Sequence, residues 1–296
     1  MAKPFLIACG DLHLCETAPI FRSAEPDWFA AQARSLRWLK AFGQTYACPI
    51  VIAGDLFDKA VGSSRLLNFA IDECPQAYAI AGNHDLPYHN REKLPLSAYG
   101  NLMRAGTIRD LDDVAIFSYG AERTVALYGF PYGKPFAPCA KQADIDVAVV
   151  HSLIWAGESQ YSRIAPDAHF SRVKDRLPGY DFYIFGDNHE TILHDNLVNC
   201  GTFYRRARGQ ETFSPVVALL SDTGIELQKI PVSQDRFAEN VAPSKNVGIH
   251  DFTELFDSLR KAEYLTCDAG QMLKEYFLSH QVEPDVYAAI ISITES

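Results

Sequence analysis

The sequence Ile50 to Asp58 reads IVIAGDLFD, an apolar run that ends in a glycine and two acidic residues. Its apolar part together with the preceding Pro49, residues 49–53, predicts a strand buried on both faces. Gly54 permits a sharp turn that carries the next side chain, Asp55, beyond the carboxyl end of that strand. In α/β sheets this edge is where ligands bind, because the loops that follow the strands converge there. The stretch therefore predicts an α/β sheet with a site at its carboxyl edge.

Four other apolar runs end in clusters of the same kind. The runs cover residues 4–8, 77–81, 146–150 and 182–185. Helical spacing of apolar residues predicts helices over 28–42, 65–71 and 94–103, so the first half alternates strands with helices. Further strands are predicted over 114–119, 124–130, 191–193 and 197–200, with a hairpin pairing 216–221 with 226–232. The pattern predicts an α/β fold in which a two-sheet β-sandwich is flanked by helices.

A polar segment over 233–249 predicts a linker between two parts of the chain. Residues 1–232 before it form the predicted main domain. Residues 250–296 after it predict a small C-terminal helical element with helices over 252–264, 270–280 and 285–293. This element either caps the main domain or contacts another molecule.

The composition excludes several classes of protein. The 296 residues are 48% hydrophobic, which excludes disorder, and the formal charge is −10, which argues mildly against broad binding to nucleic acid. Seven scattered cysteines without a C-x-x-C pair favour free thiols and a cytoplasmic location. The apolar runs are shorter than the ~18 residues that a membrane span needs, and the run near the N-terminus is too short for a signal peptide. We therefore expect no membrane association.

The five clusters supply ligands of the types that bind hard divalent cations. The candidates are Asp11, His13, Asp55, Asn83, His151, Asp187 and His189. They are enough oxygen and nitrogen donors for two ions, and they include no thiolate, so Mn²⁺, Mg²⁺, Fe²⁺ or Zn²⁺ can bind but a structural zinc–cysteine site is excluded. Two such ions activate water and hold both oxygens of a phosphoryl displacement. The predicted reaction is phosphoester hydrolysis.

The order D-x-H, G-D-x-x-D, G-N-H-D, H, G-x-x-H resembles the calcineurin-like binuclear metallophosphoesterases over residues 5–232. These enzymes have a four-layer fold. Within this family, the sequence motifs of the chain are similar to those of the nuclease subunit of SbcCD-type DNA double-strand-break repair complexes. These complexes occur in bacteria and phages, and the nuclease subunit works with an SMC-like ATPase. The similar segments are residues 11–14, 53–58, 80–85, 129–132 and 157–159, and the turn 199–205.

The resemblance assigns roles to individual residues. It implies that Asp11, His13 and His189 hold the first metal ion, that Asp55 bridges, and that Asn83 and His151 hold the second ion. His84 would face the scissile phosphate as a general acid or as a cationic stabiliser. Asp58 and Asp85 would hydrogen-bond His84 or loop amides and so fix its orientation. Mn²⁺ is the cofactor we expect.

Asp187 departs from the pattern, because the resembling enzymes usually have a histidine ligand at this position. An aspartate can still bind a divalent cation, and its added negative charge favours Mn²⁺ or Mg²⁺ over Zn²⁺. The alternative is that Asp187 is not a ligand and that water fills this position at the second ion.

Arg205, Arg206 and Arg208 form a tight basic cluster near the site motifs. Three guanidinium groups can hold a nucleic-acid backbone, or they can belong to a solvated loop that balances nearby acids. The sequence favours neither interpretation. A homodimer is a further possibility, with Trp28 and the loop 14–27 as its surface.

Three functions remain open from the sequence. The first is a two-metal phosphodiesterase that cleaves DNA as an exonuclease or endonuclease in repair or recombination, with an SMC-like ATPase as partner. The second keeps the site but acts on a small-molecule, cyclic-nucleotide or protein phosphoester. The third is a scaffold that has lost activity, which the presence of His84 and the ligand set argues against.

Overall fold

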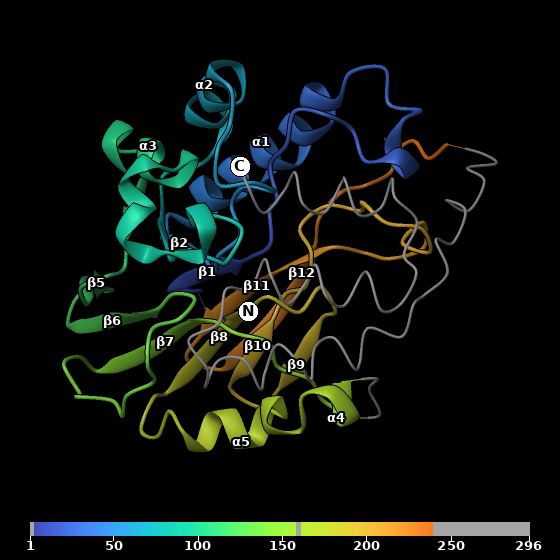
Figure 1. The fold of residues 1–296 in the computed structure, drawn as a ribbon. Helices are drawn as coiled ribbons and strands as arrows, with labels where there is room; N and C mark the ends of the chain where they lie inside the picture. The colour runs from blue at the N-terminus through green and yellow to red at the C-terminus, as the bar shows by residue number, and fades with distance from the viewer. Residues whose placement is uncertain (1–2, 158–160, 239–296) are drawn as a thin grey trace. The chain divides into compact units, whose positions relative to one another are not determined.

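The computed structural model describes residues 3–157 and 161–238, and these residues contain two six-stranded mixed sheets (Figure 1). The first sheet has the order β12-β11-β1-β2-β3-β4 and the second the order β5-β6-β7-β8-β10-β9. The strands of the first sheet are β1 Leu6–Cys9, β2 Ile50–Ile52, β3 Ala77–Ala79, β4 Ile108–Asp110, β11 Val216–Ser221 and β12 Gly224–Lys229. Those of the second sheet are β5 Ala115–Tyr119, β6 Arg123–Phe130, β7 Ile145–His151, β8 Phe182–Gly186, β9 Ile192–His194 and β10 Leu197–Asn199.

Parallel pairing in both sheets brings the carboxyl ends of the central strands to the same edge. In the first sheet β1, β2, β3 and β4 are parallel, with Cys9 opposite Ile52. In the second sheet β6, β7 and β8 are parallel, with His151 opposite Gly186. The antiparallel strands β11, β12, β5 and β9 lie toward the outside of the two sheets. The loops that carry the candidate ligands therefore all leave from carboxyl ends.

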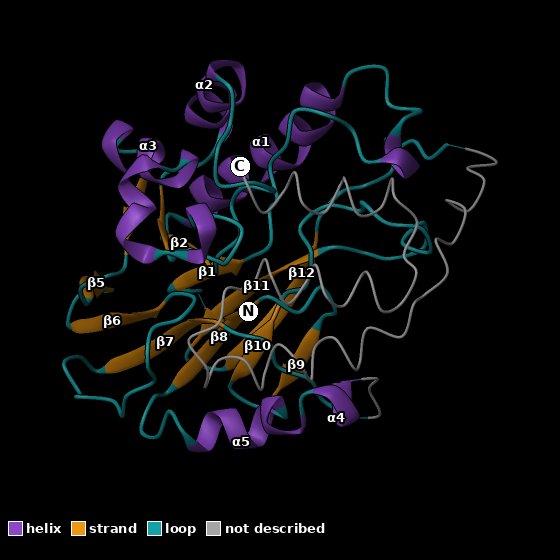
Figure 2. Ribbon diagram, in the orientation of Figure 1, coloured by secondary structure: helices purple, strands orange, loops and turns teal. Residues whose placement is uncertain are grey.

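Helices cover the outer face of each sheet (Figure 2). The first sheet carries α1 Trp28–Tyr46, α2 Ser64–Glu73 and α3 Ala98–Ala105, and the second carries α4 Tyr161–Ile164 and α5 Phe170–Asp175. Short 3-10 helices are η1 Ile20–Arg22, η2 Pro87–His89, η3 Arg91–Leu96 and η4 Pro166–Ala168. The order helix, sheet, sheet, helix makes four layers, as predicted.

Three hydrophobic clusters hold these layers together. One lies between the first sheet and its helices and includes Leu36 and Leu39 of α1. The second fills the space between the sheets, where Leu6 of β1 and Val147 of β7 are fully buried. The third joins the second sheet to the residues around α5. Burial of both sheets on both faces explains why their central strands are continuous apolar runs.

The predicted elements differ from the observed ones chiefly at helix boundaries and in short elements. Helix α1 begins behind Asp27, as predicted, and the Asp27 carboxylate accepts a hydrogen bond from the Ala30 amide. The helix predicted over 94–103 begins only at Ala98, because Pro95 interrupts the chain and the Ser97 hydroxyl caps the new start. Strand β4 and helix α5 were not predicted, because three to six residues are too few for a periodic signal.

Trp28 is buried within its own chain, which corrects its prediction as part of a dimer surface. It is 6% exposed, and its indole Nε1 donates to Cys15 Sγ at 3.4 Å. The Arg22 guanidinium lies over its ring at 5.3 Å. The side chain is already surrounded and cannot present its ring to a second copy.

Most of the predicted linker over 233–249, and all of the predicted helical element over 250–296, lie outside the described residues. Within the described part, no helix is both long and apolar enough to cross a membrane.

Candidate metal centre

The seven predicted ligands converge at the carboxyl edge of the two sheets. They are Asp11, His13, Asp55, Asn83, His151, Asp187 and His189, and we call this set the metal centre. They follow β1, β2, β3 and β8, and His151 is the last residue of β7. The loops after β1 and β2 are tied together, because the His13 amide donates to Asp55 O at 2.8 Å and the Asp11 amide to Gly54 O at 3.1 Å. The sequence clusters are thus neighbours in space.

The backbone at the metal centre is strained in a way that aims these side chains inward. Asp11, His13, Asp55 and Asp187 have left-handed φ angles of 51°, 45°, 47° and 98°. Such angles are uncommon for residues with a Cβ and collect at functional sites. The surrounding hydrogen bonds between loops hold the strained conformation.

Two glycines are required by the close approach of ligand side chains. A Cβ at Gly54, whose φ is +95°, would lie 2.1 Å from His151 Nδ1. A Cβ at Gly82 would lie 2.0 Å from Asp55 Oδ1. Any larger residue at either position would therefore displace a ligand.

The first ligand group consists of Asp11, His13 and His189. One ligand atom from each lies within 4.8 Å of the others. The two imidazole nitrogens His13 Nε2 and His189 Nε2 are 3.0 Å apart. Two neutral imidazoles and a carboxylate in this arrangement form one side of a metal site.

The second ligand group is built around His151. Its Nδ1 lies 2.8 Å from Ala53 O, so the Nδ1–H donates to that carbonyl and the Nε2 lone pair faces the site. Asn83 Oδ1 lies 3.1 Å from this Nε2. Asp11 and Asp55 also each place a carboxylate oxygen within 4.8 Å of His151.

Asp55 lies between the two groups. Its Oδ2 is 3.7 Å from His13 Nε2, and its Oδ1 is 3.5 Å from His151 Nε2. The carboxylate thus presents one oxygen to each group. This is the position that a bridging ligand of two cations must occupy.

Asp187 lies on the open side of the second group. Its amide donates to both oxygens of Asp11, at 3.1 and 3.2 Å, and its Oδ1 lies 3.9 Å from His151 Nε2. Its side chain is 30% exposed, so it borders both the ligands and the solvent. The aspartate can therefore reach the second group although it replaces a histidine of the resembling enzymes.

The electrostatics of the metal centre fit divalent cations. Burial and the neighbouring Asp55 raise the pKa of Asp11, and burial raises the pKa of Asp187. Burial, helped by Arg206 and His189, lowers the pKa of His13 to about 2, and burial also lowers the pKa of His189. The His13 and His189 imidazoles are therefore neutral ligands, and cations would relieve the repulsion among the carboxylates.

Comparison with known proteins gives the site its family. The family described as "Calcineurin-like phosphoesterase" matches this sequence over residues 6–191, more than half of the chain. The chain belongs to the calcineurin-like phosphoesterase family. The family points to phosphoester hydrolysis, and the Asp/His cluster forms its dinuclear metal-binding site. The predicted fold class of two sheets flanked by helices is confirmed.

Two solved structures to which the chain is similar are distant in sequence. Sulfate thiohydrolase SoxB of Thermus thermophilus, in complex with glycerol, is 12% identical, with a TM-score of 0.48 over 89% of this chain and 61% of that one. An archaeal phosphodiesterase is 14% identical, with a TM-score of 0.36 over 76% of this chain and 98% of that one. This chain thus spans about three-fifths of the thiohydrolase's length. The search of curated proteins finds no match.

In this phosphoesterase, His84 is exposed beside the metal centre. Its amide donates to Asp55 Oδ1 at 3.0 Å, and its Nδ1 lies 2.8 Å from Asp58 O, so the Nδ1–H donates to that carbonyl. The orientation of the ring is thus set by the Asp58 backbone. The free Nε2 is left for a substrate.

Asp58 and Asp85 differ in what their carboxylates contact. The Asp85 carboxylate is fully buried and accepts hydrogen bonds from the Gly82, Leu56 and Phe57 amides, so it braces the loops rather than His84. The Asp58 carboxylate accepts from Arg206 Nη2 at 2.6 Å and lies 3.8 Å from His13 Nδ1. The Asp85 carboxylate is thus shielded from a substrate, whereas the Asp58 carboxylate is 31% exposed and lies within 4.8 Å of ring nitrogens of His13 and His84.

The three arginines predicted as a cluster have separate environments. Arg205 is 8% exposed, and its guanidinium donates to Asp235 Oδ2, Glu211 O and Val232 O. This corrects its prediction as a substrate-binding residue, because its donors are already used inside the protein. Arg206 lies beside the metal centre through Asp58, and Arg208 is exposed.

Two buried asparagines that the sequence analysis missed hold the last ligand loop. Asn188 Nδ2 donates to Ile154 O at 2.7 Å, and Asn199 Nδ2 donates to Asn188 O at 2.6 Å. These bonds fix the turn between Asp187 and His189. The only signal in the sequence is that Asn188 stands between two predicted ligands.

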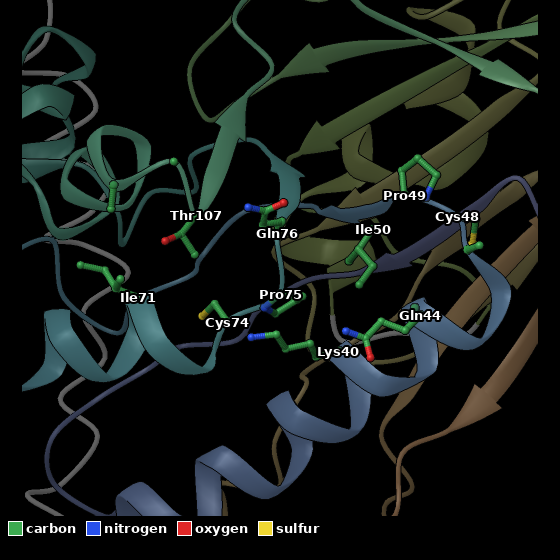
Figure 3. A pocket seen from close by; sticks show the side chains of 14 residues that line it. Lys40, Gln44, Cys48, Pro49, Ile50, Ile71, Cys74, Pro75, Gln76 and Thr107 are labelled. Atoms are coloured by element: carbon green, nitrogen blue, oxygen red, sulfur yellow. The ribbon is translucent and has the colours of Figure 1, made fainter.

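A cavity lies away from the metal centre, at the amino ends of the strands of the first sheet (Figure 3). Its volume is about 540 Å³, and its lining includes Lys40, Gln44, Cys48, Cys74 and Thr107. The lining contains no histidine or carboxylate, so this cavity cannot hold hard divalent cations as the metal centre does.

Proposed function

We propose that this phosphoesterase is a two-metal phosphodiesterase that hydrolyses DNA, with Mn²⁺ as its metal and an SMC-like ATPase as its partner. The observation that carries the proposal is the position of Asp55, which offers one oxygen to each of two ligand groups beside an exposed His84.

The residues of the metal centre divide the work between two ions. Asp11, His13 and His189 would hold one ion, Asn83, His151 and Asp187 the other, and Asp55 would bridge them. When bound, the ion pair supplies an activated water nucleophile and neutralises charge on the phosphoryl oxygens. Asp187 adds a hard oxygen ligand, which favours Mn²⁺ over Zn²⁺.

His84 supplies the proton chemistry. With its Nδ1–H donated to Asp58 O, the ring presents Nε2 toward the substrate side. A protonated Nε2 either gives its proton to the leaving oxygen or stabilises the negative charge that develops on the phosphoryl group. Both roles need the fixed ring orientation that the Asp58 carbonyl provides.

DNA as the substrate is supported by the wording of the motifs. Residues 53–58, 80–85 and 129–132 resemble the nuclease subunit of SbcCD-type complexes, whereas Glu158 and Ser159 lie outside the described residues. In the motif 129–132, Gly129 has a packing role, because a Cβ there would lie 2.1 Å from Leu111 O. Phe130 and Pro131 are buried, and Tyr132 is exposed in a cavity that His151 and Asp187 also line.

The alternative is a phosphatase or phosphodiesterase that acts on small-molecule, cyclic-nucleotide or protein phosphoesters. The same metal centre and His84 suit it equally, and the net charge of −10 favours it over a DNA substrate.

The test is an assay of purified protein with Mn²⁺ on single-stranded DNA, double-stranded DNA and methyl p-nitrophenyl phosphate, beside His84→Ala. The proposal expects metal-dependent cleavage of DNA that His84→Ala loses. Hydrolysis of methyl p-nitrophenyl phosphate, called the dye ester below, without cleavage of DNA would favour the small-substrate alternative. No hydrolysis of any phosphoester by metal-loaded wild type would favour a scaffold.

A further inference from the structure

A cavity of about 420 Å³ opens directly from the metal centre. Its lining combines two metal-centre residues, His151 and Asp187, with the loop after β6 and the end of α5, and includes Tyr132, Phe136, Ser152 and Arg176. Its volume lies within the ~300–1,000 Å³ of small-molecule sites. A ligand in this cavity would therefore touch whatever the metal centre holds.

Arg176 is a free guanidinium at the wall of this cavity. It is exposed, and its guanidinium carbon lies 4.6 Å from the Phe136 ring centroid, which holds it by a cation–π contact. Among residues 3–157 and 161–238 its side chain has neither an acidic partner nor a hydrogen-bond acceptor. Arg172, on the same helix, is instead paired with Asp167 at 2.8 Å. Arg176 thus keeps its donors for an anion.

Tyr132 provides an aromatic ring at the same cavity. Its backbone amide donates to Ala81 O at 3.0 Å, and this bond connects the backbone of Tyr132 to the loop that carries Asn83. The side chain is 38% exposed, and its ring centroid lies 5.9 Å from that of His89. Lys134, also in the lining, is already bound to Asp112 O at 3.0 Å. The cavity therefore offers one free cation and one available aromatic face.

We propose that this cavity binds the nucleotide next to the scissile phosphodiester, with Arg176 on its phosphate and Tyr132 stacked on its base. Guanidinium groups bind phosphate through paired hydrogen bonds, and aromatic rings stack on bases regardless of sequence. A substrate strand would thus place one phosphate at the metal centre and the neighbouring nucleotide in the cavity. The inference rests on the proposed function and adds to it a contact outside the metal centre.

The test for Arg176 compares three thymidine dinucleotides in Mn²⁺: one with a single phosphodiester, and two that carry an extra phosphate at the 5′ or the 3′ end. Wild type should prefer one of the phosphorylated forms by about tenfold in kcat/KM, the effect of one charge-assisted contact. Arg176→Ala should lose this preference, Arg176→Lys should restore part of it, and Arg172→Ala should keep it. A preference that survives in Arg176→Ala would overturn the role of Arg176.

The test for Tyr132 uses Tyr132→Ala and Tyr132→Phe on the preferred dinucleotide and on methyl p-nitrophenyl phosphate. Tyr132→Ala should lose about tenfold more kcat/KM on the dinucleotide than on the dye ester, and Tyr132→Phe should keep most of the wild-type ratio, because stacking needs the ring and not the hydroxyl. Equal losses on both substrates would overturn the stacking role.

Failure of this inference differs from failure of the proposed function. If wild type hydrolyses the dye ester but neither the dinucleotides nor DNA, the DNA proposal fails and the subsite falls with it. If wild type hydrolyses DNA while Arg176→Ala and Tyr132→Ala match it on every dinucleotide, the subsite alone is overturned. A Mn²⁺ titration of both variants should match wild type; reduced metal binding would mean that they act through the metal centre, against the inference.

Discussion

The part of the chain that the structure describes contains two clusters of buried charge, and they differ in whether the carboxylates have arginine partners; we call the cluster with paired carboxylates balanced. The balanced one, which we call the arginine cluster, consists of Arg22, Arg34 and Arg205 with Glu25 and Asp235. Arg22 Nη2 lies 2.6 Å from Glu25 Oε1, and Arg205 Nε lies 2.9 Å from Asp235 Oδ2. Each of the two carboxylates therefore has at least two arginine partners. In the metal centre, by contrast, three aspartates face imidazoles, and burial lowers the pKa of two of these, His13 and His189.

The direction of the pKa shifts separates the two clusters. Burial opposes ionisation of Glu25, but hydrogen bonds from Arg22 and the Arg236 amide outweigh it and lower the pKa. For Asp11, burial and Asp55 together raise the pKa. In a balanced cluster the removal of one partner leaves a buried charge unpaired, which destabilises the fold, whereas an unbalanced cluster needs cations from outside. We therefore expect variants of the arginine cluster to affect stability and variants of the metal centre to affect activity.

The largest effect is expected from Asp55→Asn, which removes the carboxylate between the two ligand groups. Phosphodiesterase kcat should fall by about 10⁴-fold, since metal ions contribute several kcal/mol of transition-state stabilisation. The metal-free protein should not lose stability, because the repulsion with Asp11 is relieved. Asp146→Asn, another fully buried aspartate, is the control and should keep activity. Wild-type activity in Asp55→Asn would contradict the assignment of Asp55 as the ligand between the two groups.

His84→Ala should lower kcat by about 10³-fold, the contribution of one general acid. Metal binding should stay as in wild type, because the His84 ring is exposed and is placed to serve the substrate. His194→Ala, an exposed histidine paired with Asp195, serves as the control. Loss of bound metal in His84→Ala would place this residue among the ligands instead.

Arg205→Ala should lower the free energy of unfolding by about 3 kcal/mol, because it leaves the Asp235 carboxylate with fewer partners in a buried site. Urea denaturation measures the change, with the exposed pair variant Arg172→Ala, expected to lose less than about 1 kcal/mol, as control. A stable Arg205→Ala protein that has lost its affinity for DNA would restore the original prediction for this residue.

Mn²⁺ at about 100 times its Kd should raise the free energy of unfolding by about 2.7 kcal/mol, through binding to the folded state alone. Asp11→Asn should lose most of this increment. Arg34→Ala should keep all of it, because the arginine cluster needs no metal. Equal increments in the two variants would contradict the distinction between the clusters.

Asp187→His should produce the smallest effect, a shift of about tenfold in relative affinity from Mn²⁺ toward Zn²⁺. The number of bound ions should not change. Competition titrations measure the ratio, and an unchanged ratio would show that Asp187 does not bind metal.

The sequence predicts much of this protein because its ligands follow apolar strands directly. A strand end followed by Gly54-Asp55 or Gly82-Asn83 can be recognised from neighbouring residues alone. The arginine cluster could not be predicted, because Arg22 and Asp235 are more than two hundred residues apart and only the fold brings them together. For the same reason Arg205 and Arg206 look equivalent in the sequence, although one is buried and the other lies beside the metal centre.

The most direct test of the central claim is a crystal structure with anomalous scattering data, from protein prepared in Mn²⁺. We predict two Mn²⁺ peaks per chain, one among Asp11, His13 and His189 and one among Asn83, His151 and Asp187, with the Asp55 carboxylate between them. A single peak, or peaks outside the metal centre, would contradict the account.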